Sequence, residues 1–72
     1  MNPKPDEILK ARKRVGWTQA QAAAACLVTV RAWQNWEAGT RKMPPGYWEL
    51  FRLRAAAKAN DDIALWMASR DV

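Results

Sequence analysis

The segment from Trp17 to Gly39, WTQAQAAAACLVTVRAWQNWEAG, decides the fold because it contains two helix starts and one helix end. Thr18 and Thr29 are each placed to accept a hydrogen bond from an unpaired N–H of a first helical turn, which is the role of an N-cap residue. Gln21, three residues after Thr18, completes a capping box. Gly39 suits the left-handed position that closes a helix. The segment therefore predicts two short helices joined by a tight turn.

The second predicted helix has an apolar face and a polar face. Trp33 and Trp36 are three residues apart and share the inner face. The other side carries residues whose chemistry matches the edges of DNA bases, because Arg can bond guanine, Asn or Gln can bond adenine, and a Val methyl can touch the thymine methyl. These residues are Val30, Arg31, Gln34 and Asn35. We interpret them as base-reading residues; the alternative is an ordinary solvated face.

Arg31 is the most informative of these residues. It stands near the start of its helix, where the helix dipole disfavours a cation by about 0.3–1 kcal/mol. Folding alone does not explain this choice, whereas a guanine contact does.

The charge distribution indicates a polyanionic partner. The chain has 72 residues, a net charge of +5 and a pI near 10.0. Residues 1–42 contain eight Lys or Arg and three Asp or Glu, so they hold the whole excess, while residues 43–72 are neutral. The basic loop with Arg41 and Lys42 suits a phosphate backbone. The cluster of Lys10, Arg12, Lys13 and Arg14 fits either helix-dipole compensation or phosphate contacts.

The composition argues against several other classes of protein. A single cysteine, Cys26, excludes an intrachain disulfide, and we expect it to be a small buried apolar group in a reducing cytoplasm. The chain has no His, no paired acids in a pocket-like context and no phosphate-binding Gly loop, so we expect no enzyme, metal, cofactor or small-molecule ligand. No apolar run reaches the roughly 20 residues of a membrane span.

The flanking sequence predicts three further helices and thus an all-α, compact bundle of about five helices in a single domain, residues 1–72. The first helix begins at Pro5 and ends before Gly16. The fourth runs from Pro45 to about Ala59, and the fifth from Asp61 to about Ser69. A continuous helix through residues 55–69 is the alternative.

The last two predicted helices, residues 45–69, carry more apolar surface than a small core requires. That surface fits either complete burial in the core or contact with a second subunit. The candidate dimer residues are Trp48, Phe51, Trp66 and Met67.

Residues 17–39 resemble the Cro/C1-type (XRE) helix-turn-helix regulators of phages and bacteria, which have the lambda-repressor-like fold. The resemblance rests on Thr18-Gln19, on Ala23 in the middle of the first motif helix, on Thr29 and on Trp36-Glu37-Ala38-Gly39. It implies base contacts from Val30, Arg31 and Asn35. It also implies backbone contacts from Thr29, Arg41 and Lys42, to which the basic cluster adds Arg14. For Gln19 it implies either a phosphate contact or support of a base contact. The segment Trp48-Glu49-Leu50-Phe51 is also similar to small phage regulators encoded beside anti-CRISPR genes.

Two positions depart from the family pattern. Leu27 stands where the turn usually has Gly, and a left-handed Leu costs roughly 1–2 kcal/mol. Either the turn absorbs this cost or the first motif helix continues by part of a turn. Ala22 replaces a usual Leu, and Trp17 or Trp33 is expected to fill the volume.

The resemblance implies a cytoplasmic, nucleoid-associated transcriptional regulator. We expect a repressor that binds an inverted repeat in double-stranded DNA as a homodimer and regulates its own operon. The alternative is a protein-interaction module, such as an antitoxin or a phage adaptor, on the same scaffold.

Overall fold

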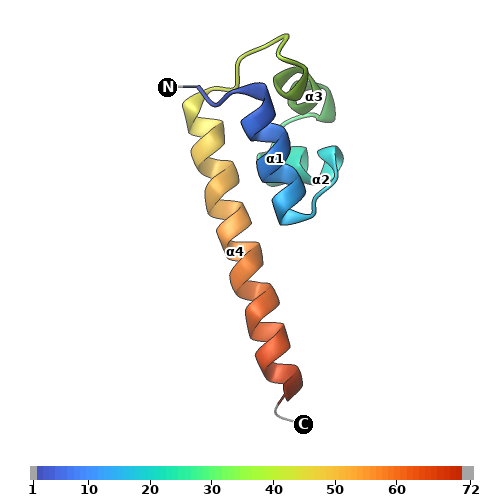
Figure 1. Cartoon of the computed structure of the whole chain (residues 1–72), viewed down its shortest axis with the longest axis vertical. Helices are drawn as coiled ribbons and strands as arrows, with labels where there is room; N and C mark the ends of the chain where they lie inside the picture. The colour runs from blue at the N-terminus through green and yellow to red at the C-terminus, as the bar shows by residue number, and fades with distance from the viewer. Residues whose placement is uncertain (1, 71–72) are drawn as a thin grey trace.

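The chain is all-helical over the residues that the computed structural model describes, which are the backbone of residues 2–70 and the side chains of residues 2–61. Its elements are α1 (Pro5–Val15), α2 (Gln19–Ala25), α3 (Val30–Ala38) and α4 (Pro45–Arg70). Helices α1, α2 and α3 lie beside the N-terminal half of α4, and the C-terminal half of α4 extends beyond them (Figure 1).

The predicted break between a fourth and a fifth helix is wrong, because α4 is one helix of 26 residues. Asn60-Asp61-Asp62, interpreted as a new helix start, lies inside it. Each Asn or Asp costs at most about 0.7 kcal/mol relative to Ala in a helix, and the alanines before them are strong helix formers. A break would instead leave backbone groups unpaired at two new helix ends. The continuous alternative is therefore the one that the chain adopts.

The predicted N-caps are confirmed. The Gln21 N–H donates to the Thr18 hydroxyl oxygen at 3.1 Å, and the Thr18 N–H donates to the Gln21 side-chain oxygen at 2.8 Å. The Ala32 N–H donates to the Thr29 hydroxyl oxygen at 3.2 Å. These local bonds set where α2 and α3 begin.

The first three helices end in the same arrangement of backbone hydrogen bonds, which requires one left-handed residue. Gly16 (φ 85°) ends α1 and Gly39 (φ 80°) ends α3. Leu27 takes that position after α2 with φ 60°, and the Val28 N–H bonds the Ala23 carbonyl at 3.0 Å. The turn therefore absorbs the strain of a left-handed Leu, and α2 does not run on.

The core is small and centred on α3. Its buried residues are Ile8, Ala22, Ala23, Cys26, Trp33, Trp36, Met43 and Phe51. Trp33 is fully buried, with its ring centroid 5.3 Å from that of Phe51. The predicted inner face of α3 is thus confirmed.

Phe51, proposed from sequence as a dimer residue, belongs to the core of its own chain. It is 2% exposed and stacks on Trp48 at a centroid distance of 5.6 Å, while Trp17 meets its ring edge-on at 5.8 Å. The sequence shows that α4 has an apolar face, but it does not show which part of that face α2 and α3 cover. Trp48 is half-buried, and the side chains of Trp66 and Met67 lie outside the described residues.

Cys26 is a buried apolar group, as the sequence predicted. It has no exposed surface, and its thiol lies 3.9 Å from the Tyr47 carbonyl oxygen. Burial raises the pKa of the Cys26 thiol to about 11, against a smaller lowering effect of the Arg54 charge. The thiol is therefore protonated at neutral pH.

None of the helices in the described part of the chain is both long and apolar enough to cross a membrane.

Replacing Leu27 with Gly is expected to stabilise the protein. The side chain is 78% exposed and contributes little burial, so relief of the left-handed strain outweighs the extra entropy of Gly in the unfolded chain. We expect the free energy of unfolding to rise by roughly 0.5–1 kcal/mol and Tm by roughly 3–6 °C. Urea and thermal unfolding measure the change.

Ala24→Gly is the matched control, because Ala24 is exposed within α2 and has ordinary helical geometry. It should lower the free energy of unfolding by roughly 1 kcal/mol. Equal destabilisation by both glycines would contradict the strain at Leu27.

Candidate nucleic-acid interface

The outer face of α3 presents three of the four predicted base-reading residues to solvent. Val30 is 42% exposed, and Arg31 and Gln34 are also exposed. Trp33 and Trp36 lie on the opposite face of the same helix and are buried in the core. Since Val30 and Arg31 directly follow the Thr29 cap and Gln34 lies one turn further on, these side chains share one end of the helix surface.

Asn35 is placed differently from the other three residues. It is half-buried, and its backbone carbonyl accepts hydrogen bonds from the N–H groups of Thr40 (3.1 Å) and Arg41 (3.3 Å). The Thr40 hydroxyl lies 3.2 Å from that carbonyl and 3.1 Å from the Asn35 side-chain oxygen. Asn35 therefore holds the loop that follows α3, and its side-chain oxygen is used within the chain.

The basic loop between α3 and α4 is anchored at both ends. Asn35 holds its start, and Met43 is fully buried near its end. The Asn2 side-chain amide donates to the Met43 carbonyl at 2.6 Å. Between these anchors Arg41 and Lys42 are exposed, so the loop carries two cations directly after α3.

Two further predicted backbone contacts lie in separate places. Thr29 keeps its hydroxyl at the N-terminus of α3, where the oxygen serves the cap. Arg14 lines a hollow of about 270 Å³ between α1 and α4 together with Trp48 and Arg52. Arg14 therefore lies on a different part of the surface from Arg41 and Lys42.

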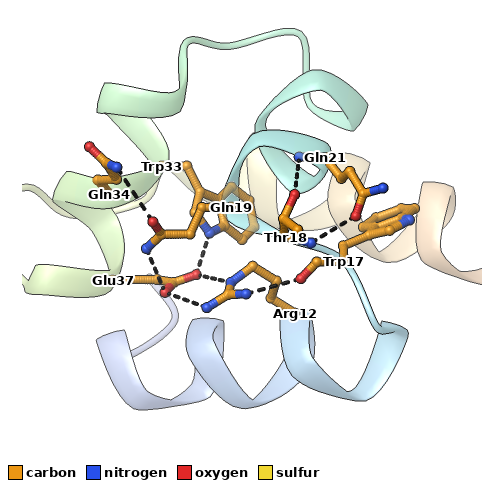
Figure 2. Close-up of polar contacts among 8 residues, drawn as sticks. All are labelled: Arg12, Trp17, Thr18, Gln19, Gln21, Trp33, Gln34 and Glu37. Atoms are coloured by element: carbon orange, nitrogen blue, oxygen red, sulfur yellow. Dashed lines mark hydrogen bonds and ion pairs between the residues drawn. The ribbon is translucent and has the colours of Figure 1, made fainter.

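Gln19, predicted either to contact a phosphate or to support a base contact, is part of a network inside the protein. Its side-chain NH₂ donates to Glu37 at 3.1 Å, and its oxygen accepts from the Gln34 NH₂ at 3.4 Å. Gln19 thus joins the start of α2 to the outer face of α3 (Figure 2).

Glu37 is the centre of this network. Its carboxylate accepts two bonds from the Arg12 guanidinium, one from Nε at 2.5 Å and one from Nη2 at 3.1 Å. It also accepts from Gln19 and from the Trp33 indole N–H. The Glu37 side chain is only 8% exposed and that of Arg12 only 13%. The other guanidinium Nη1 donates to the Trp17 carbonyl at 3.0 Å.

The protonation of Glu37 follows from these contacts. Burial by itself would raise the pKa of the carboxyl group. Hydrogen bonds from Arg12, Trp33 and Gln19, together with the positive charge of Arg12, outweigh that effect and hold the pKa below its ordinary value of 4.5. Glu37 is therefore an anion at neutral pH. Because Arg12 pairs with it, the two side chains together have no net charge.

Sequence reasoning missed the Arg12–Glu37 pair. Arg12 stands among other cations in the sequence, and it also follows the buried Ile8 by one helical turn. Glu37 is the only acid in residues 17–39 and follows Trp33 by four residues. An acid and a cation that both fall on inner helix faces are the signal that could have indicated a buried pair.

The likeness of this chain to known proteins is partial. No known family profile matches it. A Type II methyltransferase of Moraxella sp, M.MspI, is 32% identical to it over 57 residues. The match includes 79% of this chain but only 14% of the methyltransferase, so the chain spans a small part of that protein.

Replacing Glu37 with Gln is expected to lower the free energy of unfolding by about 2–3 kcal/mol at neutral pH, because the mostly buried Arg12 charge loses its carboxylate and keeps only neutral acceptors such as the Trp17 carbonyl. The difference from wild type should shrink as the pH falls below about 4.5. A carboxyl with a lowered folded pKa contributes stability above its unfolded pKa and loses it as the pH falls through the folded value. Urea unfolding over a pH series measures both effects.

Glu49→Gln is the matched control, since the Glu49–Arg52 pair is exposed by 67% and 63%. It should change the free energy of unfolding by less than about 0.5 kcal/mol. A pH-independent effect of Glu37→Gln would show that the carboxylate charge is not what stabilises the network.

Proposed function

We propose that this protein is a sequence-specific, double-stranded DNA-binding transcriptional regulator in which α2 and α3 form a Cro/C1-type helix-turn-helix. In this proposal α3 enters the major groove. The observation that carries it is the two-sided character of α3. Val30, Arg31 and Gln34 are exposed on one side, and the other side is held by buried Trp33 and Trp36. A helix held in this way presents its polar side chains at a fixed angle.

The exposed side chains supply complementary reading chemistry. The Arg31 guanidinium suits the two acceptors of guanine, and the Gln34 amide suits the donor and acceptor of adenine. Val30 offers methyl groups to the methyl of thymine. Asn35 supports the loop through its backbone carbonyl and its side-chain oxygen, and its side-chain NH₂ group is assigned to a base contact.

Phosphate contacts are assigned to the loop after α3. Arg41 and Lys42 are exposed there, and the loop is anchored by Asn35 and by buried Met43. Contacts of this kind fix the position of a protein on DNA and make binding salt-dependent.

The proposal includes a homodimer that reads two half-sites of an inverted repeat, about 34 Å apart. The N-terminal half of α4 offers apolar surface for it, with Leu53 67% exposed and Trp48 half-buried. A dimer on an operator would repress transcription by blocking polymerase, and its own operon is the proposed target.

The likeness to a Type II methyltransferase does not assign methyltransferase activity to this chain. The matched part is 14% of that protein, which is too small a share to assign the activity of the whole to this chain.

Selection of binding sites from randomised duplex DNA, followed by fluorescence anisotropy on the selected site, tests the proposal. Arg31→Ala should weaken binding to the selected site by about 5- to 100-fold, the usual effect of losing a bidentate base contact. Arg52→Ala, which removes an exposed cation on α4, should leave the affinity within about twofold. Failure to select any sequence, or an unchanged affinity for Arg31→Ala, would refute this assignment.

Lys42→Ala should weaken binding to selected and random DNA by similar factors. Loss of one phosphate contact should also reduce the slope of log Kd against log salt concentration by about 1. A salt titration of wild type and variant measures the slope. A change confined to the selected site would instead mark Lys42 as a base-reading residue.

A further inference from the structure

The N-terminal segment lies against the basic loop that follows α3. The Asn2 side-chain amide donates to the Met43 carbonyl at 2.6 Å, across 41 positions of the chain. Pro5 lies against the end of α3, since a Cβ atom on Gly39 would be 3.3 Å from the Pro5 ring. In Figure 1 the first residues accordingly lie beside the start of α4. The N-terminal segment and the loop therefore form one surface.

Asn2 supplies a hydrogen bond that the loop receives from no other described residue. Residues 41–43 follow the anchor at Asn35 and precede α4. Over the side chains of residues 2–61, the Asn2 amide is the one donor from outside the loop that bonds to residues 41–43. Segments held by few hydrogen bonds open locally at a low cost in free energy. Loss of the Asn2 donor should therefore let the loop open more often.

Like charges meet where the two segments touch. One hollow of about 350 Å³ is lined by cations of both segments, which are Lys4, Arg41 and Lys42. Their mutual repulsion opposes contact between the segments, and the bond from Asn2 to the Met43 carbonyl acts against it. A phosphate group bound at this surface would relieve the repulsion. The local charges thus favour an anion, and Asn2 holds them in place before it binds.

We infer that Asn2 is a positioning residue that prepares the loop for binding DNA phosphates. By holding the Met43 carbonyl it keeps Arg41 and Lys42 between two fixed points, of which the other is Asn35. A loop that is already ordered loses less entropy when it binds, so its contacts contribute more to affinity. The inference rests on the proposed function and deepens it, because it assigns a role in binding to a segment outside the helix-turn-helix.

Trypsin tests the positioning without DNA, because cleavage after Arg41 and Lys42 requires the loop to open. Asn2→Leu keeps the shape of the side chain and removes the donor. It should raise the cleavage rate at these two positions by about 2- to 10-fold, the usual effect of one hydrogen bond on an opening equilibrium. Cleavage after Arg54, inside α4, should not change, which separates loop opening from unfolding of the chain. Mass spectrometry of the fragments measures both rates.

Fluorescence anisotropy tests the effect on DNA. Asn2→Leu should weaken binding to selected and random DNA by similar factors of about 2- to 10-fold, because phosphate contacts carry no sequence information. In an Arg41→Ala/Lys42→Ala background, adding Asn2→Leu should change the affinity by less than about twofold, because Asn2 acts through these two cations. Asn60→Leu, the same substitution at an exposed position of α4, should change neither the cleavage rates nor the affinity.

Unchanged cleavage in Asn2→Leu would overturn the inference. Faster cleavage with an unchanged affinity would overturn it too, as would an equal loss of affinity in the Arg41→Ala/Lys42→Ala background. None of these outcomes affects the proposed function, which depends on the wild-type protein and on Arg31→Ala. Failure to select any sequence would refute the proposed function alone, because cleavage and binding to random DNA would still test the role of Asn2.

Discussion

The buried carboxylate of Glu37 is the constraint on which the arrangement of the first three helices depends. It accepts hydrogen bonds from Arg12 of α1, Gln19 of α2 and Trp33 of α3. A carboxylate that loses its partners in such a place is costly, so the helices must keep the positions that supply the donors. A buried ion pair of this kind often adds little net stability compared with apolar packing, and its contribution here is to restrict the geometry.

The small core makes such a constraint valuable. Among the side chains that the structure describes, those exposed by 2% or less are Ile8, Trp33, Phe51 and Met43, together with the small residues Ala22, Ala23 and Cys26 in and directly after α2. Ala22, Ala23 and Cys26 let α2 approach α3 closely, and the Trp33 ring fills the space between α3 and α4. Apolar packing is not directional, whereas the bonds to Glu37 are. The two together determine the angle at which α3 faces solvent.

The sequence alone correctly predicted the features that depend on local chemistry. The caps at Thr18 and Thr29, the helix ends at Gly16 and Gly39, and the inner face of α3 all follow from residues within one turn of each other. The Arg12–Glu37 pair joins residues 25 positions apart and has no local signature. The place of Phe51 likewise depended on which helices cover α4. The proposed fifth helix failed because a good cap sequence competes with continuation of an existing helix, and continuation keeps more backbone bonds.

The division of α3 into two faces has an evolutionary consequence. Val30 and Arg31 lie outside the core and are absent from the Glu37 network, so mutation can exchange them while the frame stays intact. New binding preferences are thus accessible by single substitutions that leave the domain folded. Gln34 is less independent, because its amide is bonded to Gln19. A lineage derived from this chain should diversify first at positions 30 and 31, with positions 19 and 34 changing together.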